Sequence, residues 1–75
     1  MNINIKERKF LIQFGRRVAA VRRGKTFTQE KLGILSTIGE AAVSRLERGL
    51  ANPTLVTLKR ICDVLDVDIE ELFPA

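Results

Sequence analysis

Apolar residues recur at helical spacing along most of this sequence, and that periodicity constrains the fold more than any other feature. The first series, with spacings of four, four and three residues, consists of Phe10, Phe14, Val18 and Val21. These spacings predict one face of a helix over about residues 6–23. Further helices are predicted over about residues 29–35, 40–48, 55–65 and 69–73. Because no segment alternates for long enough to form a strand, the 75 residues predict one all-α, compact domain of five helices.

Polar residues that cap helices indicate where the predicted helices begin. Thr28 has the side chain of an N-cap for the second helix, and Asp68 has that of an N-cap for the last one. Two starts are open for the third helix. Gly39 can act as its N-cap, or Thr37 and Glu40 can form a capping box that begins the helix about two residues earlier.

A single cysteine and the absence of histidine exclude several classes of protein. Cys62 alone can neither close a disulfide within the chain nor complete a zinc site. Without a histidine base, a phosphate-binding loop or a nucleophile motif, we expect no enzymatic activity and no cofactor. No apolar run reaches the roughly 18 residues that span a bilayer, and the N-terminal segment lacks the apolar centre of a signal peptide. We therefore expect a cytoplasmic protein with no membrane segment and no metal.

The net charge of +4 conceals a gradient along the chain. Residues 1–25 carry a charge of +7, residues 26–49 are neutral, and residues 50–75 carry −3. A basic segment beside a helical domain favours a polyanionic partner, most often nucleic acid. The alternative is that the basic residues only form a solvated helix face.

Four stretches of sequence carry a resemblance to a known family. They read QEKL at 29–32, VSRLERG at 43–49, NPTL at 52–55 and VDIEELF at 67–73. In this combination the chain resembles the Xre/Cro/CI-type helix-turn-helix family of DNA-binding transcriptional regulators. The resemblance implies a five-helix, lambda-repressor-like domain over residues 14–73, with the helix-turn-helix unit at about 29–48. Residues 1–13 are then an N-terminal extension of the first helix.

The same resemblance identifies the helix that begins at Glu40 as the recognition helix. It implies that four of its residues face base edges: Glu40, Ala41, Ser44 and Arg45. Arg45 can contact guanine with two hydrogen bonds, and Glu40 can accept one from cytosine. The alternatives are that Glu40 only stabilises the start of the helix and that Arg45 is only a solvated charge.

Contacts with the DNA backbone are also implied by the resemblance. The expected phosphate-contacting residues are Thr28, Gln29, Arg48 and Asn52. Short polar side chains and helix N-termini bind phosphates, which supports the first two, whereas Arg48 has the alternative of stabilising the end of its helix. The resemblance further implies a structural ion pair between Arg22 and Glu47, placed inside the domain rather than at the bases.

Two positions depart from the family pattern where the backbone is expected to turn. Thr37 stands where the family usually has glycine, and Asp66 stands at a position that is often glycine. Left-handed backbone conformations favour glycine and are uncommon for a β-branched residue such as threonine. The geometry of the turn before Glu40 therefore depends on how Thr37 is accommodated.

Two functions fit these residues. The first is a homodimeric transcriptional regulator, a repressor or controller, that binds double-stranded DNA at a palindromic operator. The family resemblance implies that its dimer interface lies in the C-terminal region, at an apolar patch made of Val67, Ile69, Leu72 and Phe73. The second is an antitoxin-type module, in which a toxin partner occupies that patch and DNA binding autoregulates the operon.

Overall fold

The computed structural model describes residues 2–74, and the regular secondary structure in that part of the chain is all helical. Its elements are α1 (Ile5–Gly24), α2 (Gln29–Leu35), α3 (Glu40–Glu47), α4 (Leu55–Leu65) and a final 3-10 helix, η1 (Ile69–Leu72). The predicted all-α domain is thus confirmed. The fifth predicted helix is a single 3-10 turn, because the chain turns away at Phe73, one residue before Pro74.

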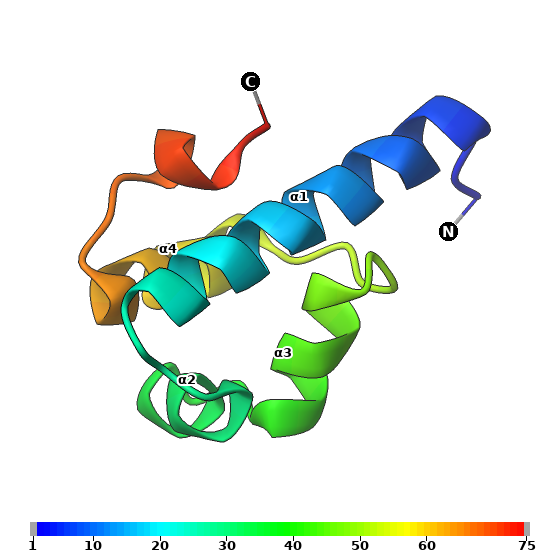
Figure 1. Ribbon diagram of the computed structural model, residues 1–75. Helices are drawn as coiled ribbons and strands as arrows, with labels where there is room; N and C mark the ends of the chain where they lie inside the picture. Colours follow the sequence, from blue (N-terminus) through cyan, green and yellow to red (C-terminus); the bar gives the residue numbers. More distant parts are fainter. Residues whose placement is uncertain (1, 75) are drawn as a thin grey trace.

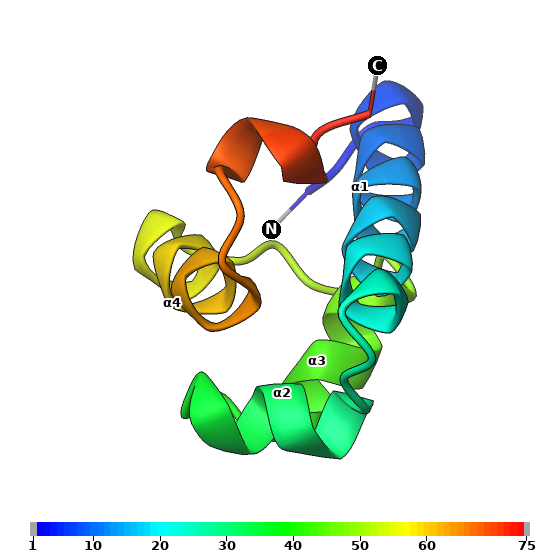
Figure 2. The same cartoon turned by 60° about the vertical axis from the view of Figure 1, so that its left-hand side comes forward.

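The long helix α1 passes through the middle of the domain (Figure 1). It packs against α3 on one side and against η1 on the other, while α4 contacts α2 and η1. The rotated view separates these layers, with α2 and α3 at one end, η1 at the other and α4 facing α1 (Figure 2). The helix-turn-helix pair therefore occupies one end of the molecule, and its outer surface is left uncovered by the remaining described elements.

One hydrophobic core joins all five elements. Its ten buried members are Phe14, Val18, Leu32, Val43, Leu46, Leu58, Ile61, Cys62, Leu65 and Leu72. Phe10, at the start of the first apolar series, is instead 42% exposed. Its ring packs against the rings of Phe14 and Phe73, with centroids 6.1 and 5.9 Å away, because α1 extends beyond the core at this end.

Side-chain caps stabilise the starts of α2, α4 and η1. The Thr28 hydroxyl accepts a hydrogen bond from the Lys31 N–H, and Thr54 does the same for α4. Asp68 and Glu71 form a capping box at η1. Helix α3 begins at Glu40 after Gly39, whose φ is +91°, so the earlier start from Thr37 does not occur.

Thr37 itself adopts a left-handed conformation, with φ of +64°. Its hydroxyl donates a 2.6 Å hydrogen bond to the Ser36 carbonyl oxygen. Asp66 also has a positive φ, +56°, where it ends α4. Both positions at which the family tends to have glycine therefore have the backbone conformation that glycine favours, although neither is glycine here.

Candidate nucleic-acid interface

The helix-turn-helix is held together by close backbone packing. The Gly39 N–H donates a 3.0 Å hydrogen bond to the Gly33 carbonyl oxygen, which brings the start of α3 against α2. A Cβ atom on Gly33 would overlap the Gly39 and Glu40 backbone, and one on Gly15 would overlap the Leu46 carbonyl. These two glycines therefore fix how closely α2 and α1 approach α3.

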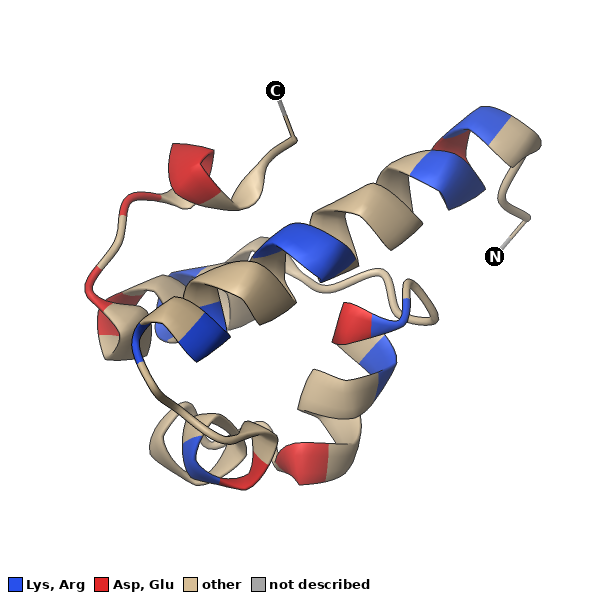
Figure 3. Cartoon of the chain, in the orientation of Figure 1, with Lys and Arg blue, Asp and Glu red and all other residues tan. Residues whose placement is uncertain are grey.

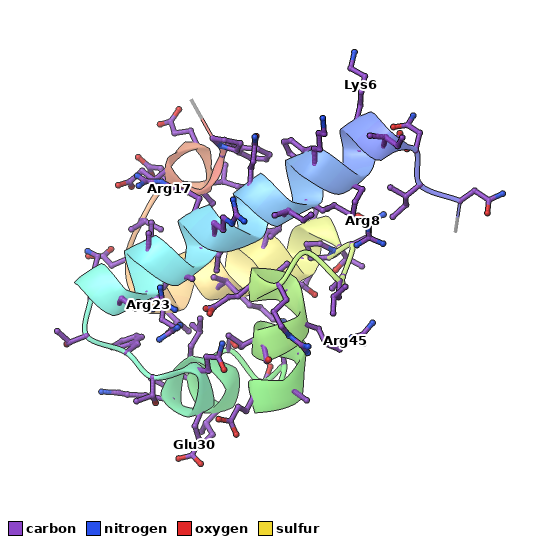
Figure 4. The ribbon with its side chains drawn as sticks, turned by 45° about the vertical axis from the view of Figure 1, so that its right-hand side comes forward. Lys6, Arg8, Arg17, Arg23, Glu30 and Arg45 are labelled. Carbon is purple, nitrogen blue, oxygen red and sulfur yellow. The ribbon has the colours of Figure 1, made fainter. Side chains whose placement is uncertain are left out.

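Helix α3 has one buried face and one face open to solvent. Val43, Leu46 and Glu47 are buried. On the other face Ser44 is half-buried, and the exposed residues are Glu40, Ala41, Arg45 and Arg48. All four residues expected to read bases thus lie on the side of α3 away from the core, and Figure 4 shows Arg45 projecting away from the body of the domain.

The two arginines of this face are oriented by main-chain carbonyls. Arg45 Nη2 donates to the Leu50 carbonyl oxygen at 3.0 Å, and Arg48 Nε donates to the Ser44 carbonyl oxygen at 3.3 Å. A guanidinium has five N–H donors, so both groups keep donors that face solvent. They are placed where an acceptor on a base or a phosphate could be bound.

The residues expected at the DNA backbone are divided between two places. Thr28 and Gln29 lie at the start of α2, and Arg48 and Asn52 flank the end of α3. The side-chain amide of Gln29 donates a 2.9 Å hydrogen bond to Glu47 Oε1 and is half-buried. This contact gives Gln29 a structural partner that the sequence did not reveal, because 18 residues separate it from Glu47.

Arg22 and Glu47 form an ion pair in the interior. Arg22 Nε lies 2.6 Å from Glu47 Oε2, and Nη2 donates to Oε1 at 3.0 Å. The two side chains are only 8% and 4% exposed. The hydrogen bond to Glu47 raises the pKa of Arg22 above its ordinary value, while burial opposes the shift. Arg22 Nη1 also donates to the Phe27 carbonyl oxygen at 2.7 Å, so the pair connects α1, α3 and the segment before α2.

Only part of the predicted apolar C-terminal patch is exposed in the structure. Leu72 is 0% exposed and belongs to the core, which removes it from any partner surface in this fold. Val67 is half-buried, whereas Ile69 and Phe73 keep exposed apolar surface. Sequence reasoning missed two exposed residues at the start of α4, Leu55 (73%) and Val56 (60%).

An open groove of about 820 Å³ lies across α4 and η1. Its lining includes Leu55, Val56, Val67 and Ile69, together with the acids Asp63, Asp66, Asp68 and Glu71. Figure 3 shows the acidic residues gathered around the end of α4 and η1, while basic residues run along α1.

Within residues 2–74 no cluster of three or more potential metal ligands occurs, and no helix there is both long and apolar enough to cross a membrane.

A sequence model of the helix-turn-helix family HTH_3 matches residues 18–72. The chain belongs to this family. The regulator y4dJ of Sinorhizobium fredii is 40% identical over 58 residues, which are 77% of this chain and 75% of y4dJ. SlrR of Bacillus subtilis is 32% identical over 62 residues, and the match covers 81% of this chain but only 41% of SlrR. Both relatives are described as HTH-type transcriptional regulators.

Solved structures show the same fold. The restriction-modification controller protein C.AhdI from Aeromonas hydrophila superposes with a TM-score of 0.82 and 36% identity, covering 84% of this chain and 96% of that one. The DNA-binding domain of BldD superposes with a TM-score of 0.78 at 24% identity, covering 88% of this chain and 96% of that domain. The helix-turn-helix protein described above is thus a DNA-binding transcriptional regulator and not an enzyme.

Proposed function

We propose that this regulator reads DNA sequence as a homodimer at a palindromic operator, acting as a repressor or controller in the cytoplasm. The observation that carries the proposal is the division of α3 into two faces, with Val43, Leu46 and Glu47 buried and Arg45 on the open side. A helix placed in this way can enter the major groove with its polar face against base edges.

The individual side chains support distinct contacts. Arg45 can donate two hydrogen bonds to guanine, Glu40 can accept one from cytosine, and the Ala41 methyl can contact thymine. Thr28 and Asn52 supply polar groups for phosphates on either side of α3. Likeness to the restriction-modification controller protein C.AhdI favours a regulatory role of the controller type.

Dimerisation is supported by the groove on α4 and η1. A single short helix reads only a few base pairs, and two-fold symmetry doubles the sequence that is read. Leu55, Val56 and Ile69 give this groove an exposed apolar surface that a second copy would cover. A toxin partner would occupy the same surface in the antitoxin-type alternative. Four acids and one base, Lys59, line the groove, so its net negative charge would favour a basic partner.

Selection of bound sequences from a random duplex library, at about 0.15 M salt, tests the proposal, because non-specific phosphate binding weakens at that ionic strength. We expect an inverted repeat whose half-sites are about 34–36 Å apart, or a multiple of that distance. Sedimentation of the free protein then distinguishes a homodimer from a monomer that awaits another partner. Recovery of no motif would contradict sequence reading, and a monomer at all concentrations would favour the antitoxin-type alternative.

A further inference from the structure

The N-terminal extension of α1 places a basic side chain beside the end of the recognition helix. Residues 5–10 are all exposed, and the match to the family model starts only at residue 18. Asn4 and Glu7 close a capping box at this end, with hydrogen bonds of 2.8 and 3.0 Å between side chain and backbone. The extension is therefore a regular, capped part of α1, and the helix sets the direction in which each of its side chains emerges.

Arg8 is the basic residue of this extension that faces α3. Its Nη1 donates a hydrogen bond to the Gly49 carbonyl oxygen, 41 residues away in the sequence. The next carbonyl, that of Leu50, accepts from Arg45 Nη2. Two guanidinium groups from different helices thus bind consecutive carbonyls of the same turn, and Figure 4 shows both side chains around that turn.

The charges at this turn are not balanced by nearby exposed acids on α3. Glu47, the acid at the end of α3, is buried and paired with Arg22. Arg8, Arg45 and Arg48 therefore leave a cationic edge where α3 ends, next to Asn52. Arg8 remains exposed and uses one donor on Gly49, so further donors are available to an oxygen ligand.

We propose that Arg8 contacts a DNA phosphate at the edge of the major groove beyond the C-terminal end of α3. This inference rests on the proposed DNA-reading function of α3. The major groove is about 12 Å wide and phosphates line both of its edges. The start of α2 would bind one edge through Thr28, and the turn after α3 would bind the other, with Arg8 adding a contact from α1.

The competing explanation is that Arg8 only ties α1 to the turn after α3. Arg8→Gln and Lys6→Gln distinguish the two, because both remove one positive charge from the same end of α1. Lys6 points away from α3 in Figure 4, which makes it a matched control. The affinity of the full chain is measured from about 50 to 200 mM salt, for a selected duplex and for a scrambled duplex of the same length.

A lost phosphate contact lowers the slope of log affinity against log salt by about 0.9 for each bound chain. The advantage of the wild type over Arg8→Gln should consequently shrink by about threefold per chain over that fourfold salt range, on both duplexes. Lys6→Gln should keep the wild-type slope. Equal slopes for Arg8→Gln and wild type would overturn the proposal and leave Arg8 with a structural role only.

Two further measurements separate a phosphate contact by Arg8 from a purely structural role. Arg8→Lys retains the charge, so it should keep most of the salt slope even though its hydrogen bond to Gly49 is lost. Ethylation of single phosphates should interfere with wild-type binding at one outer phosphate per half-site, and Arg8→Gln should abolish interference at that phosphate alone. If the wild type binds neither duplex, the proposed DNA-binding function itself is wrong. If the wild type binds normally and Arg8→Gln shows the same pattern of interference, only the proposed role of Arg8 is wrong.

Discussion

The Arg22 guanidinium and the Glu47 carboxylate lie 2.6 Å apart in the interior and join α1 to α3. Gln29 also donates to Glu47 from the start of α2. One carboxylate thus accepts hydrogen bonds from two other helices and sets the position of α3 relative to both. The orientation of the exposed face of α3 therefore depends on this buried contact.

Removing one partner of this pair leaves the other charge buried and unpaired. We expect Glu47→Ala to lower the free energy of unfolding by about 3–5 kcal/mol. Urea unfolding followed by circular dichroism measures the change. Replacing both partners, as in Arg22→Met with Glu47→Leu, should cost less than Glu47→Ala alone, since no buried charge then remains. A loss below about 1 kcal/mol for Glu47→Ala would show that the pair is exposed to water in solution.

Thr37 has a left-handed backbone conformation that is unfavourable for a β-branched residue. Thr37→Gly should raise the free energy of unfolding by about 1 kcal/mol, because relief of the strain exceeds the added chain entropy of glycine. Thr37→Ala removes the branch and the hydroxyl but retains a Cβ, so it should recover less stability. A thermal melting temperature for Thr37→Gly below that of the wild type would contradict this explanation.

Burial raises the pKa of the Cys62 thiol above its ordinary value. In the unfolded chain the thiol has its ordinary pKa of about 8.5. Above that pH the unfolded chain loses this proton while the folded chain still holds it. The contribution of Cys62 to stability is complete below this pH and is lost as the pH rises toward the folded-state value. The stability advantage of the wild type over Cys62→Ala should therefore shrink between about pH 7.5 and 9.5 in urea unfolding. A constant advantage would place the thiol in contact with solvent.

The groove on α4 offers a direct test of dimerisation. Val56 is 60% exposed and lines the groove, so Val56→Glu should leave the fold intact and place a charge on the apolar surface that a second copy would cover. We expect at least a tenfold weaker dimer, about 1.4 kcal/mol, measured by sedimentation equilibrium. Ile34→Glu is the control, because Ile34 is 67% exposed on α2 and lies outside the groove. Equal weakening by both variants would exclude the groove as the interface.

Local signals in the sequence predicted most of the fold. Thr28 and Asp68 mark their helix starts because a cap depends on residues three positions away. The choice between Gly39 and Thr37 at the start of α3 could not be made in that way, since it depends on close packing of α3 against Gly33. Sequence reasoning identified the turn but not its geometry.

Packing between residues far apart in the sequence was harder to predict. Periodicity placed Phe10 on the buried face, and the predicted C-terminal patch left Leu72 available to a partner. The structure exposes Phe10 and buries Leu72. The contact between Arg8 and Gly49 spans 41 residues and has no local signal. For the candidate interface, the residues of α3 could be identified from the sequence. The structure established that they share an exposed face and that Gln29 contacts Glu47.

The proposed role of α3 is to read base sequence through its exposed face, with Arg45 as a base-contacting residue and Arg48 as a phosphate contact. Its most direct test is to compare the Arg45→Ala and Arg48→Ala variants with the wild type in selection from a random duplex library. Arg45→Ala should lose preference at one operator position, by about 1–3 kcal/mol per half-site, and keep the others. Arg48→Ala should weaken binding to all sequences alike and reduce the salt dependence. A uniform loss of affinity from Arg45→Ala, with the recovered sequence preference unchanged, would show that Arg45 does not read a base.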